Sequence, residues 1–536
     1  MKRWQPLILL AAAQFVMVLD TSVMNVSITQ IVADLDTTIA GVQLAITLYA
    51  LVMAATMLVG ARLGAMIGAH RTFALGLLVY GVGSLTTAVS PNLPVLLFGW
   101  SLLEGVGASL VVPAIAALAA GTYQGRDRAL AYGVLGGMAG SAVAVGPVLG
   151  GWVTSNYSWR WVFVGEVIAL ALVMLRRRAL PKLAVQPGLR MDVPGGALSA
   201  LGMLLVVIGI LQGGTWGWVQ PLDPPTIAGH DVTPLGFSPV PFVVLAGAAV
   251  LWLMTIVLER RREHGRPVLF DTRMLTNRDL RSGLLTLVMQ QLILMGTFFV
   301  LPVYLQVVLG KDAFDTGVKL LPLSLSLLLL SLLGPRMAGR RSIRTVVQIG
   351  IGLLSIGALV LASAVAPDLH GMRFGVGLVF SGAGAGLLLS QLGNVIMSSA
   401  RADQTSEAGG LQGTAQNLGA SLGTALVGSI MIASLTTGFT ASIADSPSIP
   451  STTRAQVEAA AQTGIPMVTI KDARAAIERA GTDADTTDEL VAHYGDAQLA
   501  ALKQSLLLVA IVALLAFVPA RRIPRQLAAA EPAAST

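Results

Sequence analysis

The first apolar run of the chain holds two polar side chains, a carboxylate and an amide, five residues apart. Asp20 and Asn25 lie within residues 7–28, a run long enough to cross the ~30 Å hydrocarbon core of a bilayer. An ionisable side chain at that depth costs roughly 2.5 to 3.5 kcal/mol on insertion scales, so it usually faces a bundle interior or a water-filled path. We therefore interpret Asp20 as a proton-binding site. The alternative interpretation is a carboxylate that neighbouring polar groups satisfy.

Two more acids interrupt later apolar runs. Glu104 lies within residues 94–119 and Glu166 within residues 160–177, with no obvious arginine beside them at membrane depth. Three charges together in a low dielectric would repel one another strongly, so at least one should be neutral at pH 7. A proton carrier requires a group of this kind, whose pKa lies near the ambient pH so that it can both bind and release a proton. We predict Asp20 as the principal proton site, Glu166 as a second, and Glu104 as a third candidate that could line a cavity instead.

The composition is that of a polytopic membrane protein. Of 536 residues, 54% are hydrophobic and 12% charged, and the mean hydropathy is +0.75. The absence of cysteine excludes disulfides and thiolate chemistry, and the five histidines lack the spacing of paired metal ligands. Neither a nucleophile with its base nor a G-x4-G-K-[ST] loop stands out. We therefore expect no enzyme, no metal and no cofactor, with a proton gradient as the energy source.

The apolar segments of spanning length number fourteen. They fall at about residues 7–28, 43–65, 72–90, 94–119, 130–153, 160–177, 194–213, 239–258, 283–309, 316–335, 346–365, 374–399, 408–433 and 503–520. An even number places both termini on one side, and 26 of the 35 Lys and Arg residues fall on that side. This bias predicts that both termini are cytoplasmic, and the abundance of alanine, glycine and arginine indicates a bacterial protein and therefore the inner membrane. Because the basic residues form short clusters between apolar runs, we expect the lipid bilayer and no nucleic acid as a partner.

The connections suggest a plan of six, two and six helices. We predict an N-terminal six-helix bundle over residues 1–180, a linker with two extra transmembrane helices over 181–282, a C-terminal six-helix bundle over 283–520, and a cytoplasmic tail over 521–536. Residues 434–502 are soluble in character, with amphipathic helical patterns such as 473–480 and 489–502. We interpret them as an extracytoplasmic cap and a candidate surface for a periplasmic partner. A poorly ordered loop is the alternative.

Neutral polar side chains at membrane depth are candidates for binding a small-molecule substrate. Amides can donate and accept without a fixed direction, which suits a loosely specified ligand, although interhelical hydrogen bonding is the alternative for each of them. The candidates are Asn25, Trp100, Gln290, Gln291, Tyr304, Gln306, Gln391, Asn394, Gln412, Gln416 and Asn417.

Small and bend-forming residues recur at the end of the fifth apolar segment. They are Gly133, Ala142, Gly146, Pro147, Gly150 and Gly151. Small residues let helix backbones approach closely, and proline leaves a bend, so this segment should form a pliant helix contact. The pattern resembles the antiporter motif of the major facilitator superfamily, with Ala142 where glycine is usual. Ordinary small-residue packing is the alternative.

Other stretches resemble the fourteen-helix drug:proton antiporter branch of that superfamily. They are Leu19-Asp20-Thr-Ser-Val23-x-Asn25-Val26, Ser158-Trp159-Arg160-Trp161-Val-Phe163, Asp192-x2-Gly195, Gly213-x3-Gly217-Trp218, Leu301-Pro302-x-Tyr304-Leu-Gln306-x3-Gly310, Gly317-x4-Pro322 and Gly410-x7-Leu418-Gly419-x3-Gly423. The resemblance covers nearly the whole chain outside residues 434–502 and the tail. It implies an all-α major facilitator fold with two six-helix bundles, two extra central helices and a ligand site near the midplane.

Departures from the family pattern are equally informative. The loop after the second apolar segment keeps the gating residues Gly60, Gly64, Gly68 and Arg71 but has Ala65 where the family has aspartate. Trp100 stands in place of a buried arginine, Glu104 in place of glutamine, and Glu166 in place of asparagine. The usual cytoplasmic gate is therefore altered, and the N-terminal half carries extra acid.

These observations predict a monomeric secondary exporter that expels lipophilic, cationic small molecules in exchange for protons by alternating access. One alternative is a dedicated exporter of a single endogenous lipid, antibiotic or siderophore. Another is a membrane receptor or accessory protein that kept the fold and lost transport.

Overall fold

Long helices make up most of the chain in the computed structural model, which describes residues 2–182, 189–227, 230–401, 404–444, 446, 448–462 and 464–526. The long helices are α1 (Gln5–Val26), α3 (Ile39–Ile67), α4 (Ala69–Ala88), α6 (Gly105–Thr122), α7 (Gly125–Asn156), α8 (Arg160–Arg176), α9 (Val193–Leu211), α10 (Pro239–Glu263), α11 (Arg278–Val303), α12 (Ala313–Arg340), α13 (Ile343–Ala364), α14 (Gly371–Ser398), α15 (Thr405–Ala444) and α18 (Ala484–Leu515).

Short elements connect and extend these helices. They are η1 (Lys2–Trp4), α2 (Ile28–Asp34), α5 (Leu93–Leu96), η2 (Leu97–Glu104), η3 (Arg177–Ala179), η4 (Gln212–Gly214), η5 (Pro234–Gly236), η6 (Thr272–Thr276), η7 (Tyr304–Val308), α16 (Ser451–Gln462), α17 (Ile470–Arg479) and α19 (Phe517–Ala520). The strands β1 (Thr226–Ile227) and β2 (His230–Asp231) pair antiparallel, with Thr226 opposite Asp231.

The number of membrane spans is twelve by length and composition among the described residues. Helices α4 and α8 lie where the sequence predicts two further spans but do not belong to that set, and α8 is 17 residues long. The all-helical, multi-span architecture is confirmed, and the count of fourteen stays a prediction.

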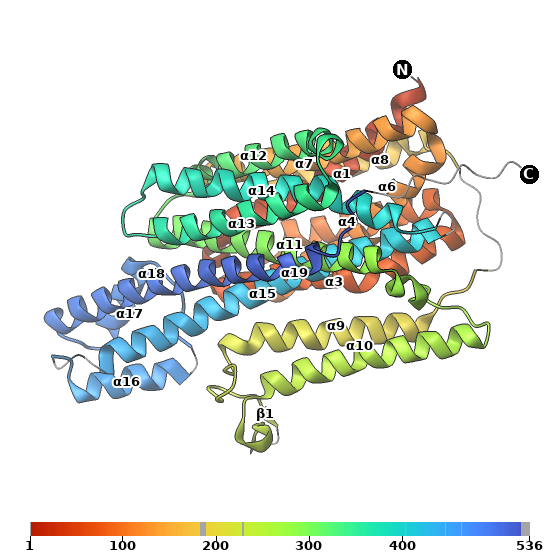
Figure 1. Cartoon of the computed structure of the whole chain (residues 1–536). Coiled ribbons are helices and arrows are strands. Elements are labelled where there is room, and N and C mark those ends of the chain that lie inside the picture. Colours follow the sequence, from red (N-terminus) through yellow and green to blue (C-terminus); the bar gives the residue numbers. More distant parts are fainter. Residues whose placement is uncertain are drawn as a thin grey trace, which may run out of the picture.

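The molecule has two distinct ends (Figure 1). We call the end that carries η1, next to the N-terminus, the terminal face, and the end that carries α16 and α17 the cap face (Figure 1). The helical hairpin α9–α10 runs along one side of the bundle in the figure.

The two extra helices are central in the sequence but peripheral in the structure. Met203 and Val207 of α9 pack against Leu51 and Ala54 of α3 and Ala425 of α15. Helix α10 packs on α9, and only 17% of its apolar window is buried. Helix α9 therefore covers the outside of the α3–α15 seam and leaves α10 an almost wholly exposed apolar surface for lipid.

The hairpin is anchored at the terminal face by a buried acid. Asp192 caps α9 by accepting a hydrogen bond from the backbone N–H of Gly195 at 3.2 Å, and it forms an ion pair with Arg261 at 3.1 Å. It also accepts from the backbone N–H of Leu269 at 3.0 Å. A Cβ at Gly195 would lie 2.2 Å from the Asp192 carboxylate, which explains the Asp-x2-Gly spacing.

Residues 434–502 fold into a helical cap. Helix α15 continues to Ala444, α16 and α17 follow, and α18 begins at Ala484. Tyr494 of α18 donates to the carbonyl of Pro466 at 2.7 Å, and Gln498 donates to the carbonyl of Val468 at 2.6 Å. The helical pattern predicted over 489–502 belongs to the longer helix α18, since no proline or glycine break separates that stretch from the last apolar run.

The two halves meet at the cap face. Gln306 of η7 accepts from the Thr29 hydroxyl at 2.8 Å and donates to the carbonyl of Val26 at 2.7 Å. The backbone N–H of Phe314 donates to Ser155 at 3.1 Å. These hydrogen bonds join α1, α2 and α7 of the N-terminal half to η7 and α12 of the C-terminal half, so the cap face is closed.

The glycines of the predicted antiporter motif form tight backbone contacts on two sides of α7. A Cβ at Gly150 would lie 2.6 Å from Val23 of α1, and one at Gly151 would lie 2.3 Å from the Ala313 carbonyl oxygen of α12. A Cβ at Gly317 of α12 would lie 2.0 Å from the Pro147 carbonyl oxygen. Helix α7 therefore couples the position of α1 to the seam between the halves.

Candidate functional site

The three membrane-level acids meet in the interior of the N-terminal half. Asp20 comes from α1, Glu104 from η2 and Glu166 from α8, and one carboxylate oxygen of each lies within 4.8 Å of the others. We call this group the acid triad. Asp20 and Glu104 are fully buried and Glu166 is 2% exposed. The sequence predicted each acid separately, and the fold brings all three to one place.

Asp20 is held by an indole. Trp100 Nε1–H points between the two Asp20 oxygens, 2.9 Å from each. Trp100 stands where the family pattern has a buried arginine, so a neutral N–H donor occupies the place of a cation. The ion pairs in the described part of the chain involve other acids than these three. The acid triad is therefore satisfied by dipoles instead of by opposite charge.

The other two acids are partly satisfied by α4. Thr87 donates to Glu104 at 3.0 Å, and Ser84 donates to Glu166 at 2.9 Å. The second oxygens, Glu104 Oε2 and Glu166 Oε1, have no hydrogen-bond partner among the described residues, and neither does the buried Tyr80 hydroxyl. Buried polar atoms without partners are rare in native proteins and commonly mark a functional site. These two carboxylate oxygens are therefore available to bind a proton.

An unusual helical turn places Trp100 and Glu104 next to each other at the site. Residues Leu97–Glu104 form a π-helix, the rare wider turn that occurs mostly at functional sites. It carries Trp100 and Glu104 toward α1. Gly83 of α4 makes room for the acid, because a Cβ there would lie 2.6 Å from Glu104 Cγ and 2.8 Å from its backbone nitrogen.

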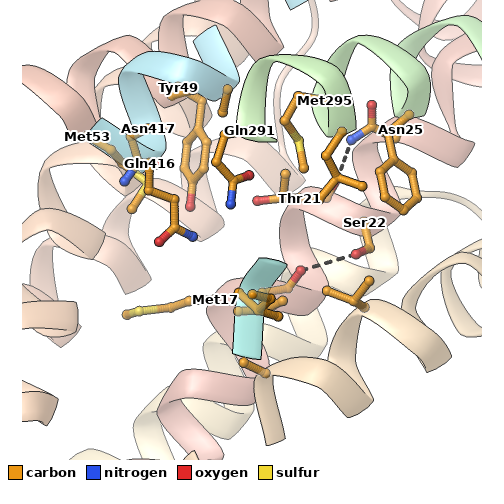
Figure 2. A pocket seen from close by; sticks show the side chains of 18 of the residues that line it. Met17, Thr21, Ser22, Asn25, Tyr49, Met53, Gln291, Met295, Gln416 and Asn417 are labelled. Atoms are coloured by element: carbon orange, nitrogen blue, oxygen red, sulfur yellow. Dashed lines mark hydrogen bonds between the residues drawn. The ribbon is translucent and has the colours of Figure 1, made fainter. Parts of the chain in front are cut away.

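A central cavity of about 270 Å³ lies between the two halves. Figure 2 shows Tyr49 and Met53 of α3 grouped around it with Gln291, Gln416 and Asn417 of the C-terminal half. Most of the lining is apolar, with methionines from both halves, among them Met17, Met53, Met57 and Met295. Methionine is flexible and polarizable, so this lining suits lipophilic ligands of varied shape. The volume is near the lower end of the usual range for ligand pockets, roughly 300–1,000 Å³.

The predicted substrate-binding residues divide into two groups in this conformation. Those that line the cavity are Asn25, Gln290, Gln291, Gln416 and Asn417. Those that lie elsewhere are Trp100, Tyr304, Gln306, Gln391, Asn394 and Gln412. Tyr304 donates to the carbonyl of Ala366 at 2.9 Å, and Gln391 donates to Ser390 at 2.9 Å. Hydrogen bonding between segments of the bundle, the alternative considered for each candidate, describes Tyr304, Gln306 and also Gln290, which donates to the carbonyl of Ala385 on α14 at 3.2 Å. Gln391 instead bonds to its neighbour within α14.

Asp20 lies outside the cavity lining. The stripe of α1 that faces the cavity contains Gln14, Met17, Val18, Thr21, Ser22 and Asn25, spaced as one helix face. Asp20 is off that stripe and turns toward η2 and α8. Tyr49 touches both sides, because it lines the cavity and its ring stacks on Trp100 with a centroid distance of 4.9 Å and an interplanar angle of 2°.

The residues predicted to gate the terminal face have unequal surroundings. A Cβ at Gly60 would lie 2.1 Å from the Ser109 carbonyl oxygen of α6, and Gly68 has a φ of +96° in the turn between α3 and α4. Gly64 has nothing closer to a Cβ than a Thr72 hydroxyl at 3.9 Å. Arg71 is exposed in the first turn of α4, and a Cβ at Gly133 would meet nothing within 4 Å.

The acid triad is also the one group of described residues with carboxylate oxygens close enough to hold a metal ion. The sequence shows no such spacing, because the three acids are far apart along the chain. Its oxygen donors would fit a hard cation chemically. The expectation of no metal stays a prediction, and transport can be tested for dependence on cations other than the proton.

Sequence reasoning missed five residues of this site: Tyr49, Tyr80, Gly83, Ser84 and Thr87. Hydroxyl-bearing residues and small residues are common in apolar helices, so their positions gave no local signal. A tyrosine at membrane depth needs a partner for its hydroxyl, and that requirement was the available clue.

Fold and site together define a membrane transporter of small molecules, built from two helical halves around a cavity, and not an enzyme. Residues 10–424 match the sequence model of the Major Facilitator Superfamily, so the chain belongs to that superfamily. The family resemblance and the all-α polytopic fold are thereby confirmed.

Curated relatives share most of the chain. The puromycin resistance protein pur8 of Streptomyces alboniger is 29% identical over 460 residues, which cover 84% of this chain and 86% of that protein. The probable actinorhodin transporter of Streptomyces coelicolor is 26% identical over 471 residues, which cover 86% and 77%. A crystal structure of a bacterial homologue of the human lysosomal transporter Spinster, inward-facing and unoccupied, matches with a TM-score of 0.62 and 15% identity over 97% of this chain and 98% of that chain. The last likeness concerns the fold alone.

Proposed function

We propose that this protein is a proton-coupled exporter of lipophilic, cationic small molecules that works by alternating access. The observation that carries the proposal is the acid triad, three buried carboxylates next to the central cavity that form no ion pair with any cation among the residues the structure describes. Such groups are expensive in a membrane and usually serve a transport path. The relatives named for puromycin resistance and actinorhodin transport support export.

The terminal face is cytoplasmic in this proposal, in the cytoplasmic membrane of a bacterium. The clustering of basic residues supports this orientation. The closed cap face then corresponds to the state that is open toward the cytoplasm. A substrate would enter the methionine-lined cavity from inside the cell, and proton uptake at the triad would accompany the return of the empty carrier.

The test uses purified protein in proteoliposomes, with ethidium and puromycin as probes. The wild-type protein should accumulate either probe when a pH gradient is imposed, whereas Asp20→Asn should fold normally and show no gradient-driven uptake. Replacing sodium by an organic cation should leave wild-type transport unchanged. Full gradient-dependent uptake by Asp20→Asn would refute the assignment of Asp20, and a strict sodium requirement would refute proton coupling.

A dedicated exporter of one antibiotic is the second candidate, and it is favoured by relatives that are each named for a single compound, such as puromycin or actinorhodin. A susceptibility panel on strains with and without the gene separates the two. Protection against one compound indicates a dedicated exporter, and protection against several lipophilic cations indicates a broad one. Binding of the probes without flux would instead indicate the receptor alternative.

A further inference from the structure

The central cavity and the acid triad are separate compartments joined by two stacked aromatic rings. Tyr49 lines the cavity and is 4% exposed, and Trp100 behind it is fully buried. We call these two residues the aromatic partition. The rings are nearly parallel at a centroid distance of 4.9 Å, and the indole N–H on the far side donates to Asp20.

We propose that the aromatic partition couples ligand binding to proton release. A ligand that enters the cavity contacts Tyr49 and moves its ring. Because Trp100 is stacked on that ring, the indole moves with it and withdraws its N–H from Asp20. The triad then exchanges protons with the cavity. Tyr49 and Trp100 are positioning residues in this inference, which rests on the proposed proton coupling and names the device that links the two sites.

The packing around Trp100 indicates that a ligand affects Asp20 through the stacked rings and not by direct contact. Trp100 donates to both oxygens of Asp20, and the hydroxyls of Tyr49 and Tyr80 also act on this carboxylate, so a displacement of the stacked rings changes the environment of the acid. Trp100 sits in the π-helical turn Leu97–Glu104, a rare geometry that is frequent at functional sites. The lining face of α1 turns away from Asp20, so the ligand has no direct contact with the carboxylate.

The titratable groups that surround Asp20 come from four elements. They are Glu104 of η2, Glu166 of α8, Tyr80 of α4 and Tyr49 of α3. Helix α7, which also packs on α1, presents Gly146 and Gly150 to it. Below about pH 10, the ordinary pKa of a phenol, a pH dependence of ligand binding would therefore originate in the three carboxyl groups of the triad, and Tyr49 is the neighbour of Asp20 in this set that also lines the cavity.

The coupling between ligand binding and proton release can be measured as a pH dependence of ligand affinity. If ligand binding releases protons, affinity for the ligand must rise with pH by the reciprocal amount. We measure ethidium affinity by fluorescence anisotropy over a range of pH, with purified protein in detergent. Coupled sites typically influence one another by about 5- to 150-fold, and wild-type affinity should change within that range between acidic and alkaline pH.

Two variants break the partition at different points. Tyr49→Leu removes the stacked ring, and Trp100→Phe keeps a ring but removes the N–H that reaches Asp20. Both should bind ethidium with an affinity that is nearly independent of pH. Tyr49→Phe keeps the stack and should retain the pH dependence of the wild type.

The outcomes separate this inference from the proposed function. Wild-type pH dependence in both Tyr49→Leu and Trp100→Phe overturns the aromatic partition and leaves proton coupling intact. Absence of pH dependence in the wild type, together with absence of gradient-driven uptake, overturns the proposed function itself. If Tyr49→Leu does not fold, Trp100→Phe alone decides, since its ring keeps most of the packing volume.

Discussion

The contact between Gly151 and α12 offers a direct test of how the halves move. A Cβ at Gly151 would lie 2.3 Å from the carbonyl oxygen of Ala313 and 2.7 Å from its carbonyl carbon. Backbone atoms cannot rotate away, so Gly151→Ala must push α7 and α12 apart. The strain exists only while the cap face is closed, because separation of the halves removes the contact.

The magnitude follows from the packing. Overpacking a close contact by one methyl group costs about 1–3 kcal/mol. Applied to the closed state alone, that free energy shifts the equilibrium toward the open cap face by about 5- to 150-fold. Gly133→Ala is the matched control on the same helix, since its Cβ would meet nothing within 4 Å.

The assay takes advantage of the absence of natural cysteine. Ala313→Cys places the only thiol of the protein at the seam, where the native residue is 7% exposed. Its rate of reaction with a maleimide in detergent reports how often the cap face opens. The rate should be higher on the Gly151→Ala background than on the Gly133→Ala background by the factor given above. Equal rates on the two backgrounds would refute the view that this contact holds the cap face closed.

Two further predictions concern the triad and the cap. Gly83→Ala should lower thermal stability by about 1–3 kcal/mol and impair ethidium transport, because its Cβ would lie 2.6 Å from Glu104 Cγ. Gly81→Ala, which meets nothing within 4 Å, is its control, and similar losses in both would contradict the argument. Asp483 caps α18, where the backbone N–H and the hydroxyl of Thr486 hold the pKa of Asp483 below its ordinary 3.8. Because the pKa is lowered, the ionised Asp483 stabilises α18 fully at pH values above 3.8. This stabilisation is lost as the pH falls through the lowered pKa of the folded protein. Amide exchange in the first turn of α18 should therefore speed up in acid, after correction for intrinsic rates, in the wild type but not in Asp483→Asn. The same acceleration in both would show that another group is responsible.

Some features of this protein follow from the sequence by itself. An apolar run of about 20 residues must be a helix in a bilayer, because its backbone polar groups have to be satisfied internally. Long helices therefore appear where the hydropathy predicts them. An acid inside such a run is equally conspicuous, so Asp20, Glu104 and Glu166 were found one by one. Glycine spacing in α7 likewise predicted a close helix contact.

Tertiary structure decided what those residues do together. Hydropathy does not say which helices are neighbours, so the meeting of three acids and the hydrogen bond from Trp100 were not predictable. An amide looks the same in sequence whether it faces a cavity, as Gln291 does, or joins two halves, as Gln306 does. The position of α9 and α10 outside the bundle also depended on packing. The sequence of each apolar run determines that it forms a helix and where a polar residue interrupts it. Whether that polar side chain is buried, which group it bonds and whether a ligand can reach it depend on the neighbouring helices, which only the tertiary structure supplies.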